Sequence, residues 1–468
     1  MLFNRFFCFI FLFTITVLAT AETNNKLLIS TPLSGGGATV FATGRNAFSL
    51  PSANMPLMQK LDFNVGNSFF RNPWVIAPAS TDARDGLGPL FNTNGCQNCH
   101  IKDGRGHAPT HAEDSAVSLL VRLSIPESDS MLKAADQEAL AEPTYGGQLQ
   151  DFAVPGMLPE GRIHIEYSPI KKELAGGEIV MLRKPILSIR DLAYGPLHPK
   201  AQMSARIASP MIGLGLLEAI EQNDILALAD PDDKDGDGIS GKANLVWDTE
   251  AQALTLGRFG WKAGQPTVRQ QNAAAFNGDL GITSSVFTQD HCSQKQTACL
   301  NAPDGGQPEL SDKILNLVTF YASNLAVPAR RNHRSDSVKV GQQLFSKIGC
   351  VDCHQAQWRT SKNYAFSWLA NQTITPYTDL LLHDMGEGLA DNRPEFLANG
   401  REWRTPPLWG IGLTNAVSKE AGFLHDGRAR NIKEAILWHG GEAEKSQKAF
   451  SNMPPRQRAS LIEFLNNL

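Results

Sequence analysis

The chain has 468 residues, of which 42% are hydrophobic and 19% are charged, and its formal net charge is −4. This composition is typical of an ordinary globular protein, and the length favours at least two domains. The small net charge and the lack of a basic run give no reason to expect binding to nucleic acid.

Residues 1–21 have the layout of a secretory signal peptide. Arg5 precedes an apolar run over 6–18, and the small residues at 19–21 provide a cleavage site. A membrane anchor is the alternative interpretation, but the apolar run is short for a bilayer span. We therefore expect cleavage after Ala21, a periplasmic location, and no membrane span in the mature chain.

Two Cys-x-x-Cys-His motifs lie far apart in the sequence. They consist of Cys96, Cys99 and His100 in the first copy and of Cys350, Cys353 and His354 in the second. In this pattern the two thiols form thioethers to the vinyl groups of a haem and the adjacent imidazole binds the iron. A thioredoxin-type pair would lie in a βαβ pattern, and a structural zinc site would need a second ligand pair nearby. The two copies therefore predict two covalently bound c-type haems.

The sequences before the two motifs are also similar. A Leu-Phe pair begins six residues before the first Cys of each motif, and a Gly directly precedes that Cys. In both stretches, 88–95 and 341–349, we expect a short amphipathic helix that packs its apolar face against the porphyrin.

Between the motifs, the stretch 161–167 alternates like a β-strand, and an acidic loop follows further along. Asp233, Asp235 and Asp237 stand at alternate positions with glycines between and after them, which is the opening of a calcium loop. The twelfth position holds Asn244 where such loops have Glu, so we expect weak calcium binding. A solvated acidic turn is the alternative.

Cys292 and Cys299 are close in sequence, and in an oxidising compartment such a pair predicts a local disulfide. A metal site that includes His291 is the alternative, although no fourth ligand is visible.

Helical spacing over 310–325, closed by Pro328, predicts a terminal helix of the first domain, and the apolar residues at 461–465 predict a second one at the chain end. We therefore expect a mainly α fold with two cytochrome c-like domains. The first covers 22–329, enlarged by insertions with minor β structure, and the second covers 330–468.

Several further motifs are similar to those of a known family. The segments 91–95, 103–106 and 423–428 resemble the bacterial di-haem cytochrome c peroxidase and MauG superfamily. More closely, the segments 145–150, 213–220, 382–386 and 403–408 resemble its di-haem oxidoreductase branch, over roughly 60–468 of the chain. That branch is often labelled as thiol oxidoreductases, but cysteines already alkylated by haem cannot exchange disulfides.

The resemblance implies two unequal haems. In the relatives, the electron-transfer haem takes a second axial ligand, usually Met, from a helix after a His-Asp-Gly motif. His439 stands at that place, 14 residues after His425, and is expected to give the second haem two His ligands. Imidazole in place of thioether lowers the reduction potential. Met453 is the alternative ligand, and His425 either bonds a haem propionate or the backbone, or is structural.

For the first haem, peroxide chemistry requires a distal group that moves a proton between the two oxygens. By similarity to the Glu and Gln of the relatives, Glu160 and Gln148 are the expected catalytic residues, with Glu218 as a further candidate. His107 and His111 follow the first motif, but closeness in sequence does not place them on the distal face.

Three classes of function remain open: a peroxidase-like redox enzyme, a non-catalytic electron-transfer cytochrome, and a protein in which haem is structural. The enlarged first domain favours the enzyme, because a carrier needs only a small domain around an exposed haem edge. A small cytochrome or a similar protein is the expected redox partner.

Overall fold

The computed structural model describes residues 31–109, 114, 117–128, 134 and 136–468. The helices are α1 (Gln59–Arg71), α2 (Cys96–Cys99), α3 (Leu214–Glu218), α4 (Gln222–Leu226), α5 (Val268–Leu280), α6 (Thr297–Leu300), α7 (Asp312–Ser323), α8 (Asp336–Lys347), α9 (Thr414–Val417), α10 (Ile432–Leu437), α11 (Glu444–Asn452) and α12 (Pro455–Asn466). The strands are β1 (Leu90–Phe91), β2 (Leu119–Ser124), β3 (Phe152–Ala153), β4 (Arg162–Leu174), β5 (Glu178–Arg190), β6 (Gln202–Ile207), β7 (Leu245–Asp248), β8 (Ala253–Leu256), β9 (Trp358–Arg359), β10 (Thr373–Ile374), β11 (Leu382–Asp384) and β12 (Glu402–Arg404). The predicted signal peptide lies outside the described residues.

The expected mainly α fold with two cytochrome c-like domains is wrong. The chain is 27% helix and 19% strand. Its strands pair into small antiparallel sheets of two strands each. The first domain, 22–329, expected to carry insertions with only minor β structure, provides β1 to β8. This is a mixed α and β fold, because turn-rich sequence between short apolar runs favours hairpins over long helices.

Two helix pairs nevertheless have the predicted elements. The helix expected over 310–325 is α7, which packs against α1, and the expected C-terminal helix is α12, which packs against α8. Each crossing is close enough to require a glycine. A Cβ on Gly66 of α1 would lie 2.1 Å from the Leu317 carbonyl oxygen, and one on Gly341 of α8 would lie 2.0 Å from the Ser460 carbonyl oxygen.

The helix expected before each motif forms only at the second. Ser335 caps α8 by accepting a hydrogen bond from the Val338 amide, and the helix runs to Lys347, just before Cys350. Before Cys96, the same pattern contains Gly88, Pro89 and Asn94, which disfavour a helix, and residues 90–91 pair as β1 with β3. The predicted helix over 88–95 is therefore wrong.

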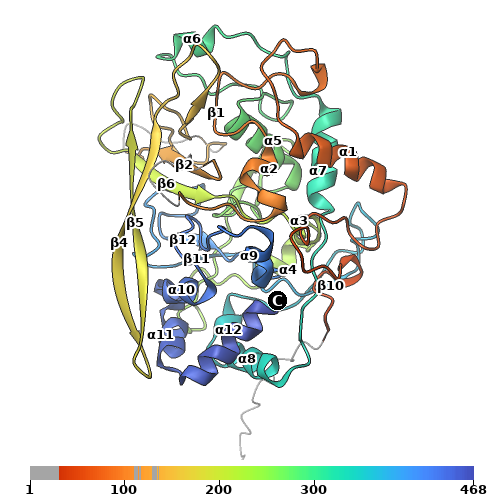
Figure 1. Cartoon of the computed structure of the whole chain (residues 1–468), viewed down its shortest axis with the longest axis vertical. Coiled ribbons are helices and arrows are strands. Elements are labelled where there is room, and N and C mark those ends of the chain that lie inside the picture. The colour runs from red at the N-terminus through yellow and green to blue at the C-terminus, as the bar shows by residue number, and fades with distance from the viewer. Residues whose placement is uncertain (1–30, 110–113, 115–116, 129–133, 135) are drawn as a thin grey trace, which may run out of the picture.

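The longest hairpin, β4–β5, runs along one side of the molecule beside the C-terminal helices (Figure 1). Arg458 of α12 donates hydrogen bonds to the carbonyl oxygen of Ala175 and to the Glu178 carboxylate, at 2.9 and 3.0 Å. Arg183 of β5 donates to the carbonyl oxygens of Gly427 and Arg428, each at 2.9 Å. Residues from early in the chain thus cover the C-terminal part.

Two large hydrophobic clusters form the interior. The first surrounds α1, α5 and α7 and also takes in Leu369 and Leu380, while the second surrounds α8 and α12 and also takes in Val121 and Leu182. Each cluster therefore contains residues from both sides of the predicted 329/330 boundary, which lies between α7 and α8. Within the described part of the chain, no helix combines the length and apolar character needed to cross a bilayer.

Candidate haem sites

The first motif ends in a histidine with one ring nitrogen fixed and the other free. Cys96 to Cys99 form α2, and the His100 Nδ1 lies 2.7 Å from the carbonyl oxygen of Ser209. A carbonyl oxygen can only accept a hydrogen bond, so Nδ1 carries the proton and Nε2 keeps its lone pair. The ring of Phe70, from α1, lies 6.1 Å from the His100 ring. The His100 tautomer with its proton on Nδ1 is the one that binds a metal through Nε2.

The second motif repeats this arrangement. The His354 Nδ1 lies 2.9 Å from the carbonyl oxygen of Tyr377, and the ring of Phe345, from α8, lies 6.0 Å from the His354 ring. Burial lowers the pKa of both His100 and His354 to about 4, so both imidazoles are neutral at physiological pH. Both are therefore ready to act as metal ligands.

The four motif thiols, by contrast, are poorly suited to dithiol exchange or to zinc binding. Burial raises the pKa of Cys96 and of Cys350 to about 12, with further raising by nearby Asp279 and Cys353, respectively. Exchange and zinc binding require the thiolate, which forms at cysteines of lowered pKa. The environment of the cysteines agrees with the thioether interpretation of the motifs.

A largely apolar cavity that is open in part to solvent contains the second motif and is called the second cavity. His439 lines the same cavity as Cys350, Cys353 and His354, whereas Met453 does not. The His439 Nδ1 lies 2.7 Å from the carbonyl oxygen of Ala435, one helical turn earlier. Nε2 of His439 is thus the free ring nitrogen, as in the two motif histidines.

His425 and His383 also line this second cavity, but both are engaged by protein groups. The ring of His425 is stacked on Trp403 with centroids 3.8 Å apart. His383 is bonded on both nitrogens, with Nε2 2.8 Å from Asp379 and Nδ1 2.7 Å from Glu442. His383 therefore has no open nitrogen, and the Nε2 of His425 lies 3.7 Å from the Asp426 carboxylate.

A separate cavity, also open in part and called the first cavity, contains Cys96, Cys99 and His100 of the first motif. Among the described residues that line it, His100 is the only histidine. Three carboxyl groups line it: Glu138, Asp279 and Glu395. The Arg393 and Arg122 guanidinium groups lower the pKa of Glu138 to about 2 against the effect of burial, whereas burial raises the pKa of Asp279. Burial therefore favours the protonated form of Asp279.

Gln148 and Glu160, the expected catalytic residues, line neither cavity. The Gln148 Nε2 donates to the Asp279 carboxylate at 2.8 Å and to the Gly278 carbonyl oxygen at 3.0 Å. Gln148 thus lies directly behind a carboxyl group of the first cavity.

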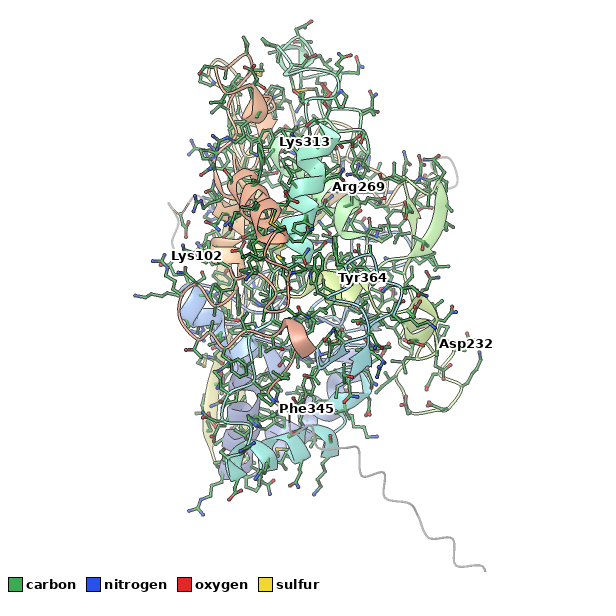
Figure 2. All side chains as sticks on the ribbon, turned by 90° about the vertical axis from the view of Figure 1, so that its right-hand side faces the viewer. Lys102, Asp232, Arg269, Lys313, Phe345 and Tyr364 are labelled. Atoms are coloured by element: carbon green, nitrogen blue, oxygen red, sulfur yellow. A yellow bond between two sulfur atoms is a disulfide. The ribbon has the colours of Figure 1, made fainter. Side chains whose placement is uncertain are left out.

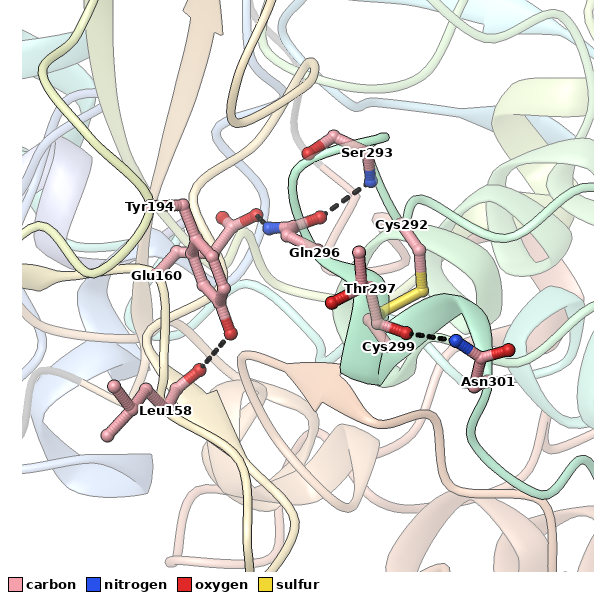
Figure 3. Close-up of a disulfide and its surroundings, with 9 residues drawn as sticks. All are labelled: Leu158, Glu160, Tyr194, Cys292, Ser293, Gln296, Thr297, Cys299 and Asn301. Carbon is pink, nitrogen blue, oxygen red and sulfur yellow. Dashed lines mark hydrogen bonds between the residues drawn. A yellow bond between two sulfur atoms is a disulfide. The ribbon is translucent and has the colours of Figure 1, made fainter.

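Glu160 lies deeper, next to the segment closed by the predicted disulfide between Cys292 and Cys299, which is present (Figure 3). Its carboxylate accepts hydrogen bonds from the Gln150 amide at 2.6 Å and from Gln296 at 2.5 Å. Burial raises its pKa to about 8. Because both sulfurs are used in the disulfide, the alternative metal site with His291 is wrong.

The remaining sequence candidates are engaged elsewhere. Glu218 accepts hydrogen bonds from the Val268 amide at 2.7 Å and from the Tyr364 hydroxyl at 2.6 Å. His107 bonds the carbonyl oxygen of Ala108 at 2.9 Å and lines neither cavity. His111 lies outside the described residues.

The acidic loop lies at the edge of the molecule, where Figure 2 labels the neighbouring Asp232. Carboxylate oxygens of Asp233, Asp235 and Asp237 all come within 4.8 Å of one another, and the three residues are exposed. Asn244 is turned away: its Nδ2 donates to the carbonyl oxygens of Lys262 and Glu395 in the interior. The three aspartates remain grouped as predicted, without the twelfth-position residue.

The two cavities share a wall that the sequence did not reveal. Arg105, Trp261, Arg404 and Pro406 line both of them. The Trp261 Nε1 donates to the Ile207 carbonyl oxygen at 2.9 Å, which fixes the indole. Arg105 and Arg404 belong to the segments of family resemblance, but only the fold brings them together.

The whole described chain matches one family model. The model described as "Di-haem oxidoreductase, putative peroxidase" matches residues 29–468. The chain belongs to the di-haem oxidoreductase family. No curated protein matches it. Among solved structures, hydrazine synthase of Kuenenia stuttgartiensis is similar at 13% identity over 92% of this chain and 96% of that one, with a TM-score of 0.32.

The residues of this di-haem oxidoreductase fit two haems. Each of two cavities contains a Cys-x-x-Cys pair and a neutral histidine with a free Nε2. The apolar lining of the cavity around His354 suits a porphyrin, and two buried arginines in the shared wall suit its carboxylates.

Proposed function

We propose that this di-haem oxidoreductase is an exported c-type enzyme of the peroxidase type, with haem bound covalently through Cys96 and Cys99 and through Cys350 and Cys353. The observation that carries the proposal is the difference between the cavities. One contains a second histidine with a free Nε2, His439, while the other has only His100 among its described lining residues. An iron with two histidine ligands suits electron transfer, and one with an open position suits chemistry.

His354 and His439 are the residues that would hold the iron of the electron-transfer haem. Each keeps its ring orientation through a backbone carbonyl oxygen, of Tyr377 and Ala435 respectively. Carbonyl acceptors fix the tautomer and raise ligand basicity. Haem at this site supplies one-electron chemistry, and the electrons come from a redox partner such as a small cytochrome.

Asp279 is proposed as the proton-handling group of the first cavity. Burial raises the pKa of Asp279, which favours a carboxyl group that holds a proton it can give and take back. Gln148 then acts as a positioning residue, because its amide holds the Asp279 carboxyl group at 2.8 Å. Glu160 supports the backbone next to Asp279. Its carboxyl group binds the backbone amide of Gln150, and the side-chain amide of Gln150 donates to the Gly278 carbonyl oxygen at 2.8 Å.

The spin state of each iron tests the unequal roles. We expect one low-spin haem and one high-spin haem in the purified protein by electron paramagnetic resonance. His439→Ala should convert the low-spin signal to high spin, while His164→Ala, on the β4–β5 hairpin outside both cavities, should leave both signals unchanged. Two low-spin haems in both redox states would instead favour the electron carrier.

Peroxide turnover with reduced cytochrome c as donor tests the activity. Asp279→Asn should lower kcat by about 10²-fold or more, within the range of general acid catalysis, with haem content and spin states unchanged. Gln148→Ala should have a smaller effect of the same kind. Wild-type turnover no faster than free haem would contradict the peroxidase assignment.

A further inference from the structure

Two buried guanidinium groups in the shared wall have no acid to neutralise them among the described residues. Arg105 is 5% exposed and Arg404 is 8% exposed. Among the described residues, Arg105 forms no ion pair, and its Nη1 has no hydrogen-bond partner although it is buried. Its guanidinium lies 5.7 Å from the centre of the Trp261 ring and 5.8 Å from that of Phe423, so aromatic faces surround it.

Arg404 has partners, but they are neutral. It donates to the Gly260 carbonyl oxygen at 2.9 Å and to the Thr405 carbonyl oxygen at 3.1 Å. Asp379 is the carboxylate whose charge raises the pKa of Arg404, and it is already used: it accepts from the Leu381 amide at 3.0 Å and binds His383 Nε2 at 2.8 Å. Arg404 therefore also lacks a carboxylate of its own.

The two charges also repel each other. Burial is the main cause that lowers the pKa of both arginines to about 10, and for Arg404 the positive charge of Arg105 adds to it. Other buried cations nearby are paired: Arg206 lies 2.6 Å from Glu395, and Lys262 lies 2.8 Å from Asp391. Burial of a charge costs free energy unless an opposite charge neutralises it. Arg105 and Arg404 lack such a partner, so they require anions from outside the chain.

We propose that Arg105 and Arg404 form one anion site in the shared wall, which binds carboxylate groups of the haems on both of its sides. The inference rests on the proposed function, because it requires a haem in each cavity. Both arginines line both cavities, and each haem carries two propionate groups for which guanidinium is the matching donor. Because the wall is buried, the same two charges act on both irons.

The site has a consequence that can be measured without turnover. A cation held beside a haem favours the reduced, less positive iron, so its removal lowers the reduction potential. Removal of a charge beside one haem shifts the reduction potential of that haem alone, whereas removal of a charge in the shared wall shifts the potentials of both haems. The test is a redox titration of the di-haem protein, with each haem followed by its visible absorption and spin state.

Arg105→Gln should lower both midpoint potentials, each by about 59 mV if the reduction equilibrium changes tenfold. Arg105→Lys keeps the charge and should restore most of both shifts. Arg122→Gln is the control, because Arg122 lines only the cavity of His100 and is paired with Glu138 at 3.3 Å. It should leave the potential of the haem at His354 unchanged.

Arg404→Gln is a second, independent variant should Arg105→Gln fail to fold, and it should also lower both potentials. Variants are compared at equal haem content, measured by mass spectrometry of the denatured chain. Wild-type protein with fewer than two attached haems would overturn the proposed function itself. Two attached haems together with potentials that move singly, or not at all, would overturn only the shared anion site.

Discussion

Replacement of Gly341 by alanine should destabilise the C-terminal helix pair strongly. The added Cβ would lie 2.0 Å from the Ser460 carbonyl oxygen and 2.6 Å from the Phe464 Cβ. Ordinary van der Waals contact begins near 3.4 Å, so α8 and α12 must separate by more than 1 Å along that line. Overpacking against backbone that cannot rotate away costs about 3 kcal/mol, at the upper end of the usual range.

The separation would also move Phe345, which α8 holds against the rings of His354 and Phe464, at 6.0 and 5.4 Å. We therefore expect Gly341→Ala to lower the guanidinium unfolding midpoint, followed by circular dichroism, and to broaden the absorption band of the haem at His354 before that of the other. Gly44→Ala is the matched control, because nothing lies within 4 Å of a Cβ there. Equal midpoints for the two variants would refute this account of the crossing.

Three further outcomes are expected. Burial raises the pKa of Glu160 from 4.5 to about 8, so the folded state binds a proton that the unfolded state has lost; stability from this group is full below about pH 4.5 and is lost as the pH rises through about 8. Glu160→Gln should flatten that slope in unfolding midpoints measured across this range. Calcium should bind weakly at the acidic loop, and Asp235→Asn should reduce the heat of binding in titration calorimetry. Gly66→Ala should destabilise the α1–α7 crossing as Gly341→Ala does the other, because its Cβ would lie 2.1 Å from the Leu317 carbonyl oxygen.

Each of these outcomes has a clear opposite. An unchanged pH slope in Glu160→Gln would mean that the carboxyl group is ionised when buried. For calcium, Asp232→Asn is the control, because Asp232 lies outside the group of three carboxylates. Equal losses in both loop variants, or no binding heat in the unchanged protein, would contradict the calcium prediction. A wild-type unfolding midpoint in Gly66→Ala would mean that the two helix crossings differ.

Local sequence signals were sufficient for part of this fold. The apolar spacing over 310–325 and near 461–465 predicted α7 and α12, since helices of that length have a readable period. The seven-residue separation of Cys292 and Cys299 was enough to predict the disulfide. The helix predicted before the first motif is wrong, because a Leu-Phe pair followed by turn residues fits a two-residue strand as well as a helix.

The wall between the cavities could not be predicted in this way. Arg105 and Trp261 come from two distant loops and Arg404 from the end of β12, and nothing in their neighbourhoods in sequence indicates that they are buried together. Gln148 and Glu160 are expected by similarity, which gives residue types but no depth. The fold places Gln148 against the Asp279 carboxyl group and links Glu160, through Gln150, to the neighbouring Gly278 carbonyl oxygen. Asp279 itself lies near the end of α5 in a stretch without a motif.

The β4–β5 hairpin has a consequence for the order in which the molecule assembles. Its bonds to α12 join residues up to 283 positions apart, so they form only after α12 is available for folding. Contacts of such long range form late in folding. Leu461 and Leu465 of α12 line the cavity that contains Cys350 and Cys353, so these thiols are expected to stay accessible until α12 is in place. Any enzyme that attaches haem there has this interval in which to act, before the hairpin closes over the C-terminal helices.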